Sequence, residues 1–180
     1  LMPTLPNPVD YAVPGFVLLI LFEMWLSRRR DRAAYEPRDT LTSLALGLGS
    51  TVAGLLTGGI VVALGFALSR YALLEIGWQW WAWIACFILD DLAYYWFHRT
   101  AHRVRWFWAS HVIHHSSQHY NLSTALRQTW TPFTALPYWL PLAFMGFSPW
   151  MILLQQSVSL LYQFFIHTER VGKMWRPIEF

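Results

Sequence analysis

The sequence contains little cysteine and little charge, and these shortages exclude several classes of protein. The single cysteine, Cys86, cannot build a disulfide framework or a thiolate metal site. Charged residues make up 13% of the chain, against about 25% in soluble domains. The basic residues are not interleaved along one exposed face, so we expect no nucleic-acid partner despite a net charge of +3. The N-terminus also lacks the basic segment and cleavage site of a removable signal peptide.

Long apolar stretches dominate the sequence instead, and apolar residues make up 56% of it. Residues 9–26, 41–68 and 78–97 are each long enough for a membrane-spanning helix, which needs about 20 residues. Residues 132–147 and 149–166 are shorter, so they predict either two further spans or a shallow hairpin. We therefore expect an all-α fold, a polytopic membrane bundle of helices.

Glycines in the second apolar stretch indicate where a neighbouring helix packs. Ser50, Gly54 and Gly58 are spaced four residues apart, so they share one face of a helix. Small residues in this register allow two membrane helices to approach closely. A nucleotide-binding loop is the alternative, but no predicted strand followed by GxGxxG is present.

Positive charge marks one side of the expected bundle. If the first three stretches cross the membrane and the last two return, the loops 27–40, 98–131 and 167–180 share a side. These loops contain twelve of the thirteen Lys and Arg residues, and only Arg70 lies opposite. The positive-inside rule predicts that this side is cytoplasmic. All seven histidines fall on the same side, so we expect a cytoplasmic histidine-rich metal site.

Six histidines lie within residues 98–119, and their spacing is typical of metal ligands on helices. His98 and His102 are four residues apart, so on a helix their imidazoles project from one face. His111, His114 and His115 repeat this spacing with one additional histidine. Two such helices side by side would direct five imidazoles into one space. Clustering imidazoles beside an apolar region costs desolvation energy, and metal binding offsets that cost.

Ligand type alone does not identify the metal, because imidazole binds zinc, iron, copper and nickel. A zinc protease would need HExxH, and Arg99 stands where the glutamate would be. More than four imidazoles favour two ions, and two irons together supply the electrons that O2 cleavage needs. The first hypothesis is therefore a di-iron oxygenase. The second is a non-catalytic metal-binding protein or transporter module, and the third is a membrane scaffold without metal.

Two acidic residues lie near the end of the third apolar stretch, where acids are costly and usually functional. Asp91, Tyr95, His98 and His102 follow the spacing of one helix face. We therefore predict that Asp91 and Tyr95 orient a ligand imidazole by hydrogen bonding, with a buried ion pair as the alternative for Asp91. Asp90 points elsewhere, and we expect it to pair with an arginine.

Residues 90–102 and 108–117, which contain the HxxxH and HxxHH boxes, resemble the fatty acid hydroxylase/sterol desaturase superfamily. Residues 114–117 followed by 120–128 are similar to its alkylglycerol monooxygenase branch. The likeness covers about residues 78–180. It divides the chain into N-terminal transmembrane helices, residues 1–77, and the N-terminal part of a catalytic domain, residues 78–180.

The resemblance implies a membrane-bound non-heme di-iron enzyme that uses O2 to hydroxylate or desaturate an alkyl, acyl or sterol substrate. The family has a further HxxHH box downstream, and the sequence ends before one. We therefore expect a truncated chain whose residues 1–180 bind iron weakly on their own. His119 matches no family box, and we expect it to be a solvated loop residue. The implied iron ligands are His98, His102, His111, His114, His115 and His167.

The electrons must come from an external donor, because the sequence contains no dinucleotide fingerprint, cysteine cluster or heme signature. We expect a cytoplasmic small redox protein, or a reduced pterin if the resemblance to the branch holds. A basic rim could bind this donor or anionic headgroups, although positive-inside bias accounts for it equally well. The rim consists of Arg99, Arg103, Arg105 and Arg127.

The lipid is expected to reach the metals through an apolar tunnel formed by the helices after Trp78 and the 132–166 hairpin. Its aromatic lining would be Trp106, Trp108, Trp130, Tyr138 and Trp139, although plain packing is the alternative. A polar stretch precedes the hairpin. We predict that Asn121 and Arg127 in this stretch hydrogen-bond the substrate headgroup, and helix capping is the alternative.

Overall fold

The computed structural model describes residues 8–29, 34–170 and 172–173, and all regular structure within them is helical. This confirms the all-α prediction. The elements are α1 (Pro8–Arg29), α2 (Pro37–Ser69), α3 (Trp80–Arg103), α4 (Arg105–His111), the 3-10 helices η1 (Leu122–Leu126) and η2 (Pro132–Thr134), α5 (Leu136–Met145) and α6 (Pro149–Phe165).

Within the described residues, α1 and α2 are the two helices long and apolar enough to cross a membrane. They contain 22 and 33 residues, and their most apolar windows have mean hydropathies of 1.7 and 2.1. Only 11% and 6% of these windows are buried, so most of their apolar surface faces outward. Such a surface suits lipid rather than water. Helix α3 has 24 residues but contains two adjacent acids, and α5 has only 10.

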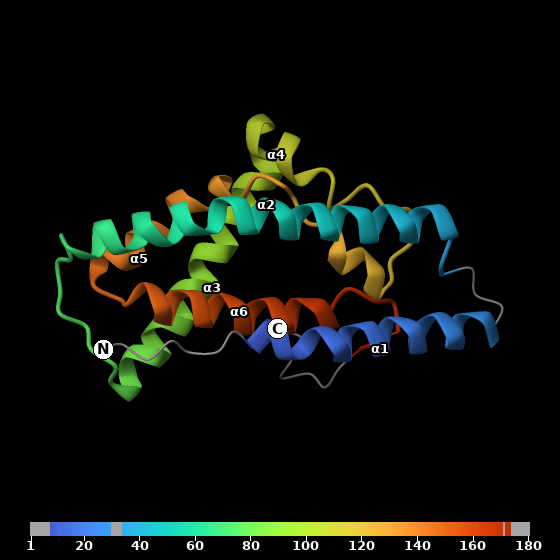
Figure 1. Cartoon of the computed structure of the whole chain (residues 1–180), viewed down its shortest axis with the longest axis horizontal. Coiled ribbons are helices and arrows are strands. Elements are labelled where there is room, and N and C mark those ends of the chain that lie inside the picture. Colours follow the sequence, from blue (N-terminus) through green and yellow to red (C-terminus); the bar gives the residue numbers. More distant parts are fainter. Residues whose placement is uncertain (1–7, 30–33, 171, 174–180) are drawn as a thin grey trace.

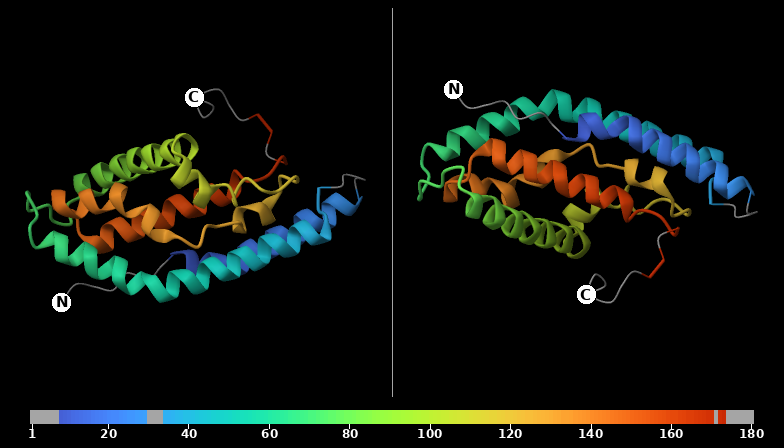
Figure 2. Two further views of the ribbon diagram at one scale, coloured as in Figure 1. Left: turned by 90° about the horizontal axis from the view of Figure 1, so that it is seen from above. Right: turned by 90° about the horizontal axis from the view of Figure 1, so that it is seen from below.

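The helices form three layers (Figures 1 and 2). Helices α1 and α2 make one outer layer, the α5–α6 hairpin lies in the middle, and α3 covers the opposite side. The main core lies between α3 and the hairpin, where Ala82 and Cys86 pack near Leu142 and Met151. Cys86 is fully buried, as expected of a small apolar side chain.

Local sequence signals explain where the helices begin and end. Helix α2 starts with Pro37 at its first turn, and the Glu36 carboxylate accepts a hydrogen bond of 2.7 Å from the Asp39 amide. Helix α5 ends at Gly146, which has a left-handed φ of 116°. A Cβ atom at Gly146 would also collide with the Leu74 carbonyl. Glycine is therefore required at the turn that closes the α5–α6 hairpin.

The close approach to α2 occurs at different glycines from those predicted. A Cβ atom at Gly54 or Gly58 would meet no other described atom within 4 Å, so that expected helix contact is not made here. Gly49 instead lies against the indole ring of Trp130, and Gly47 lies against η1. The small residues of α2 therefore make room for the loop that follows the histidines.

Candidate metal centre

Four imidazoles meet at the C-terminal end of α3. His98 and His102 lie on the last turns of α3, His111 ends α4, and His115 lies in the following turn. One nitrogen atom from each lies within 4.8 Å of the others. The Nε2 atoms of His98 and His102 are 3.1 Å apart, and so are those of His111 and His115. Both histidine boxes therefore face one space.

The second box lies only partly on the helix that its spacing predicted. Helix α4 ends at His111 and has only seven residues. The His114 and His115 amides then donate to the His111 and Val112 carbonyls, three residues earlier. These tight turns continue the helical direction far enough to keep His115 beside His111.

His114 faces His167 rather than the centre of the four-histidine group. Their Nε2 atoms are 3.1 Å apart. Nδ1 of His114 lies 3.0 Å from the carbonyl oxygen of Arg127, and Nδ1 of His167 contacts the carbonyl oxygen of Gln163. His167 follows α6, so the last helix brings a third segment of chain to the cluster.

These carbonyl contacts determine which nitrogen atoms carry hydrogen. A carbonyl oxygen only accepts, so Nδ1 of His114 and of His167 must donate, and each neutral ring presents a lone pair at Nε2. Two lone pairs 3.1 Å apart cannot form a hydrogen bond with each other. Two nitrogen ligands on one metal ion lie about 2.8–3.4 Å apart, given bonds of about 2.0–2.1 Å. The pair therefore fits two ligands of a shared cation.

Burial and crowding favour the neutral imidazoles that a metal requires. Burial is the main cause that lowers the pKa of His111 to about 3 and that of His114 to about 4. Neighbouring imidazoles lower both further, and the hydrogen bond to the Arg127 carbonyl partly opposes this for His114. Burial and neighbouring imidazoles also lower the pKa values of His98 and His115. At neutral pH protons therefore compete little with a metal ion for these imidazoles.

The residues next to this cluster on α3 differ from those expected. Asp91 is exposed, and Tyr95 is 51% exposed, its hydroxyl accepting a hydrogen bond from Arg99. Tyr94 is the tyrosine beside the cluster, with its hydroxyl 3.4 Å from Nδ1 of His98. The orienting roles of Asp91 and Tyr95 stay predictions.

Asp90 is the buried acid of α3, only 1% exposed. No arginine of the described residues pairs with it, which differs from the prediction. Its carboxylate accepts hydrogen bonds of 2.6 Å from the Trp139 indole and 3.0 Å from the Ser159 hydroxyl. Ala82, Cys86 and Asp90 are four residues apart, so the small residues before Asp90 marked the face that enters the core.

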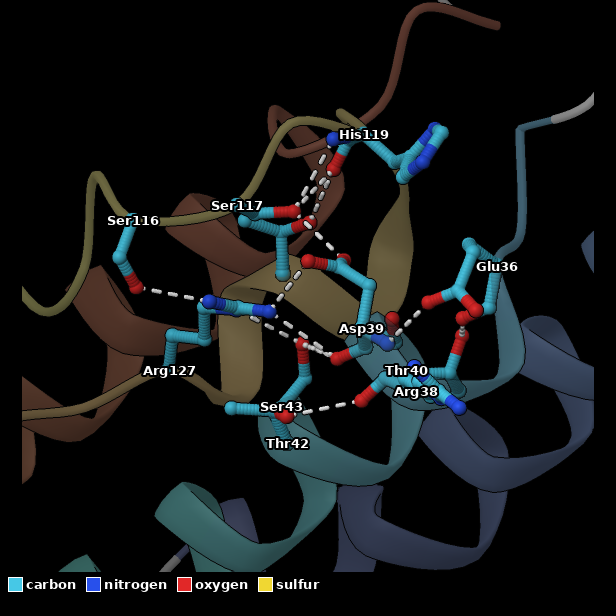
Figure 3. Close-up of polar contacts among 12 residues, drawn as sticks. Glu36, Arg38, Asp39, Thr40, Thr42, Ser43, Ser116, Ser117, His119 and Arg127 are labelled. Atoms are coloured by element: carbon cyan, nitrogen blue, oxygen red, sulfur yellow. Dashed lines mark hydrogen bonds and ion pairs between the residues drawn. The ribbon is translucent and has the colours of Figure 1, made fainter.

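Arg127 belongs to the interior and not to the exposed basic rim (Figure 3). Its guanidinium is 3% exposed and forms an ion pair of 2.6 Å with Asp39 at the start of α2. It also donates to the hydroxyls of Ser43 and Ser116, at 2.9 and 2.7 Å. Because the backbone carbonyl of Arg127 accepts from His114, this residue joins α2 to the histidine cluster.

Asn121 is likewise buried, and its contacts are those of a helix cap. Its side chain accepts from the Ser123 amide and hydroxyl and thereby caps η1. It also donates to the Ala34 carbonyl. Substrate binding by Asn121 and Arg127 stays a prediction, since every contact given above goes to protein groups.

Glu23 is a buried residue that the sequence interpretation did not assign. Its carboxylate accepts hydrogen bonds from the Leu122 amide, at 2.8 Å, and from the hydroxyls of Tyr35 and Thr168. Burial and the neighbouring Glu23 carboxylate raise the pKa of Tyr35, so that phenol stays protonated. The position of this acid deep inside the apolar stretch 9–26, which otherwise contains only Asp10 at its start, was the available signal. Glu23 holds α1 against η1 and against the residue that follows His167.

Comparison with known proteins agrees with this arrangement. Residues 83–179 match the fatty acid hydroxylase family. The alkylglycerol monooxygenases of Danio rerio, Xenopus tropicalis and Homo sapiens are 39%, 38% and 36% identical to this chain over 97% of its length. The chain spans only 39–40% of the length of these curated relatives. No solved structure matches. The family match covers more than half of the chain and includes all the facing histidines, and the chain therefore belongs to the fatty acid hydroxylase family.

Proposed function

We propose that this chain forms part of a membrane-bound non-heme di-iron oxygenase that hydroxylates or desaturates a lipid. One observation carries the proposal: imidazoles from three segments of chain form facing pairs whose Nε2 atoms are 3.1 Å apart. The family match and the alkylglycerol monooxygenase relatives support oxidation of a lipid. The relatives' activity is carried over as part of the proposal, since the chain spans about two fifths of their length.

The six facing histidines divide into two groups, which suits two ions. The first group has four members with converging nitrogen atoms, enough for one ion. The second is the His114–His167 pair, which supplies two ligands and needs others from outside the described residues. Iron bound at these positions would supply the redox chemistry for O2-dependent attack on a C–H bond. The proposed ligands are His98, His102, His111, His114, His115 and His167.

The protein groups around the ligands hold the imidazole rings in place. The carbonyls of Arg127 and Gln163 fix the tautomers of His114 and His167, so that both Nε2 atoms point inward. The Tyr94 hydroxyl beside His98 suits the same task. We retain the proposals that Asp91 and Tyr95 assist ligand orientation and that Asn121 and Arg127 contact substrate, each after a rearrangement.

Membrane placement and electron supply complete the proposal. We propose a multi-pass protein with the cluster on the cytoplasmic side, because twelve of the thirteen Lys and Arg residues share that side. Residues 1–77 would supply transmembrane helices and residues 78–180 the hydroxylase-like part. A cytoplasmic small redox protein or a reduced pterin would donate electrons. Arg99, Arg103 and Arg105 are exposed beside the cluster and suit docking of an acidic donor.

Metal analysis tests the site. The protein, extended through the further histidine box that the family resemblance predicts, is purified in detergent, stripped with chelator, loaded anaerobically with ferrous iron and analysed by mass spectrometry for bound metal. We expect iron uptake that His98→Ala abolishes and that His119→Ala retains, because His119 belongs to none of the facing pairs. Equal iron uptake by both variants would contradict the ligand assignment.

Product analysis tests the reaction. Membranes that contain the protein are supplied with a reductant, isotopically labelled O2 and a long-chain alkyl or acyl lipid. Hydroxylation would place the oxygen label in the lipid, and desaturation would remove two hydrogen atoms without the label. An iron-loaded sample with neither product would contradict the oxygenase proposal.

A non-catalytic metal-binding function is the second candidate, and the four-histidine group favours it. Four imidazoles with converging nitrogen atoms are a complete tetrahedral set for a single structural zinc ion. This function predicts that the purified protein retains zinc, takes up no iron and forms no lipid product. Iron uptake with a labelled product would exclude it.

A further inference from the structure

Three helices turn one face each toward a groove in the outer layer. The lining residues of α1 include Val9, Val13, Phe16 and Ile20, which recur every three or four residues. The lining residues of α2 from Thr40 to Thr51 follow the same spacing. Helix α6 contributes Leu160, Gln163 and Phe164, and His167 follows them just after the helix. The groove has a volume of 1180 Å³. Small-molecule pockets usually have about 300–1,000 Å³, so this groove suits a larger ligand.

This groove is not the tunnel that the sequence predicted. The expected aromatic residues Trp106, Trp108, Trp130, Tyr138 and Trp139 do not line it. The indole of Trp139 binds Asp90 in the core, and that of Trp130 donates to the Leu46 carbonyl. The groove lies mainly on α1 and α2, which precede the residues that match the family. The two helices that are long and apolar enough to cross a membrane therefore also form the groove.

The polarity of the groove indicates the kind of molecule that fits it. Among the described residues that line the groove, none carries a carboxylate, and Arg28 is the one Lys or Arg side chain. The polar side chains of Ser27, Tyr35 and Thr40 lie where α1 ends and α2 begins, whereas the α1 wall from Val9 to Met24 is apolar. Polar residues elsewhere in the lining are Ser50, Thr51, Gln128 and Gln163, and the Ser50 and Thr51 hydroxyls donate to the Gly47 carbonyl of their own helix. From Val9 to Arg28 the wall is about 28 Å long at the helical rise per residue. One membrane leaflet is about 15 Å deep, so a full hydrocarbon chain with its headgroup fits.

The position of His167 connects the groove with the histidine cluster. His167 lines the groove and faces His114 through its Nε2 atom. Phe164, one turn earlier, stacks on Phe16 with ring centroids 3.9 Å apart. Thr168, the next residue, donates to Glu23. His167 therefore lies level with the polar half of α1, beside the headgroup end of the groove.

We propose that this groove binds a long-chain membrane lipid, with its hydrocarbon chain along α1 toward Val9 and its neutral or anionic head near Ser27 and Tyr35. Only one part of this proposal rests on the proposed function, namely that the bound lipid is the substrate of the metal site. A lipid can enter laterally, because many groove side chains on α1 and α2 are exposed toward the surrounding bilayer. Chain-length preference would then depend on the residues at the Val9 end.

Photo-crosslinking tests the proposal. The probe is a hexadecyl lipid with a diazirine on its chain, added to the protein in phosphatidylcholine nanodiscs, and labelled residues are mapped by mass spectrometry. We expect labels on the groove faces of α1, α2 and α6 that an excess of the unlabelled lipid removes. Labels spread evenly around α1 and α2, or not removed by competition, would overturn the proposal. Absence of label in the groove, because another segment of protein fills it, would also overturn it.

Matched tryptophan variants sharpen the test. Val13→Trp places a large ring inside the groove, whereas Leu18→Trp places it on a face of α1 outside the groove. We expect competable labelling to fall about tenfold in the first variant, equivalent to about 1.4 kcal/mol of steric cost, and to stay unchanged in the second. Leu44→Trp and Leu48→Trp form the corresponding pair on α2. Equal labelling of the groove and outer-face variants would contradict the site.

Metal content separates this inference from the proposed function. His98→Ala should lose iron but keep competable labelling, because His98 does not line the groove. Val13→Trp should keep iron. If no form of the protein binds iron, the proposed function fails, and the labelling pattern still decides whether the groove binds lipid.

Discussion

The ion pair between Asp39 and Arg127 gives the sharpest test of how the fold supports the histidine cluster. Asp39→Asn removes the negative charge and keeps the size of the side chain. The guanidinium of Arg127 is 3% exposed, so it would remain buried without its counter-ion. The Ser117 hydroxyl donates a hydrogen bond of 2.6 Å to the other carboxylate oxygen of Asp39, and the substitution would weaken this bond as well. Breaking one side of a buried ion pair costs about 3–5 kcal/mol, and we expect a loss of that size.

The same change should weaken metal binding without touching a ligand. The Arg127 carbonyl holds Nδ1 of His114 at 3.0 Å, and its position depends on the anchored side chain. Loss of a hydrogen-bonding group that orients a metal ligand lowers metal affinity about 10–100-fold. Denaturant unfolding in detergent micelles measures the stability, and titration with cobalt measures the affinity. Arg38→Gln is the control, because Arg38 is exposed on the same turn of α2.

A double variant separates the pair from its individual members. Asp39→Leu combined with Arg127→Met replaces both charges with apolar side chains, which is often neutral for a buried pair. We therefore expect the double variant to regain most of the stability that Asp39→Asn loses. Two results would show that the ion pair does not hold Arg127 against the start of α2. The first is an Asp39→Asn variant as stable as Arg38→Gln, and the second is a double variant whose loss of stability equals the sum of the losses of the single variants.

Two further predictions concern the histidines and the glycines. Because the pKa values of His111 and His114 are lowered to about 3 and 4, the unfolded chain binds more protons than the folded chain below pH 6.5. The melting temperature of the metal-free chain should therefore fall as the pH drops from 6.5 toward 4, and a flat profile would contradict the assigned burial. Gly49→Ala should shift the fluorescence of Trp130 and destabilise the fold by about 1–3 kcal/mol, because its Cβ would collide with the indole ring. Gly54→Ala, in open space within α2, should leave the fluorescence unchanged and should not destabilise the fold, and equal effects of the two substitutions would contradict this packing.

Short-range periodicity predicted the parts of this molecule that depend on one helix at a time. The apolar stretch 41–68 became α2, and the 132–166 region became the α5–α6 hairpin. His98 and His102 share a face because four residues make slightly more than one helical turn. The two histidine boxes were expected to face one space because their spacing placed them on two helices side by side, and the ends of α3 and α4 bring them together.

Long-range contacts were not predictable in the same way. Arg127 and Asp39 are 88 residues apart, and no local pattern joins them. The sequence therefore suggested a solvent-facing or substrate-facing role for an arginine that is buried. The burial of Asp90 beside Trp139 and Ser159 was not predicted, because these partners lie 49 and 69 residues further along the chain. The small residues Ala82 and Cys86, at the spacing of Asp90, determine which acid enters the core.

The facing imidazole pairs also affect how the protein is maintained in a cell. Without a cation, the His114–His167 pair brings two nitrogen lone pairs together, and this opposes the native packing. An ion that binds only the native form shifts the folding equilibrium by mass action. A shortage of the ion would therefore enlarge the unfolded pool that proteases remove, so the amount of this protein would follow metal supply even without a change in its synthesis.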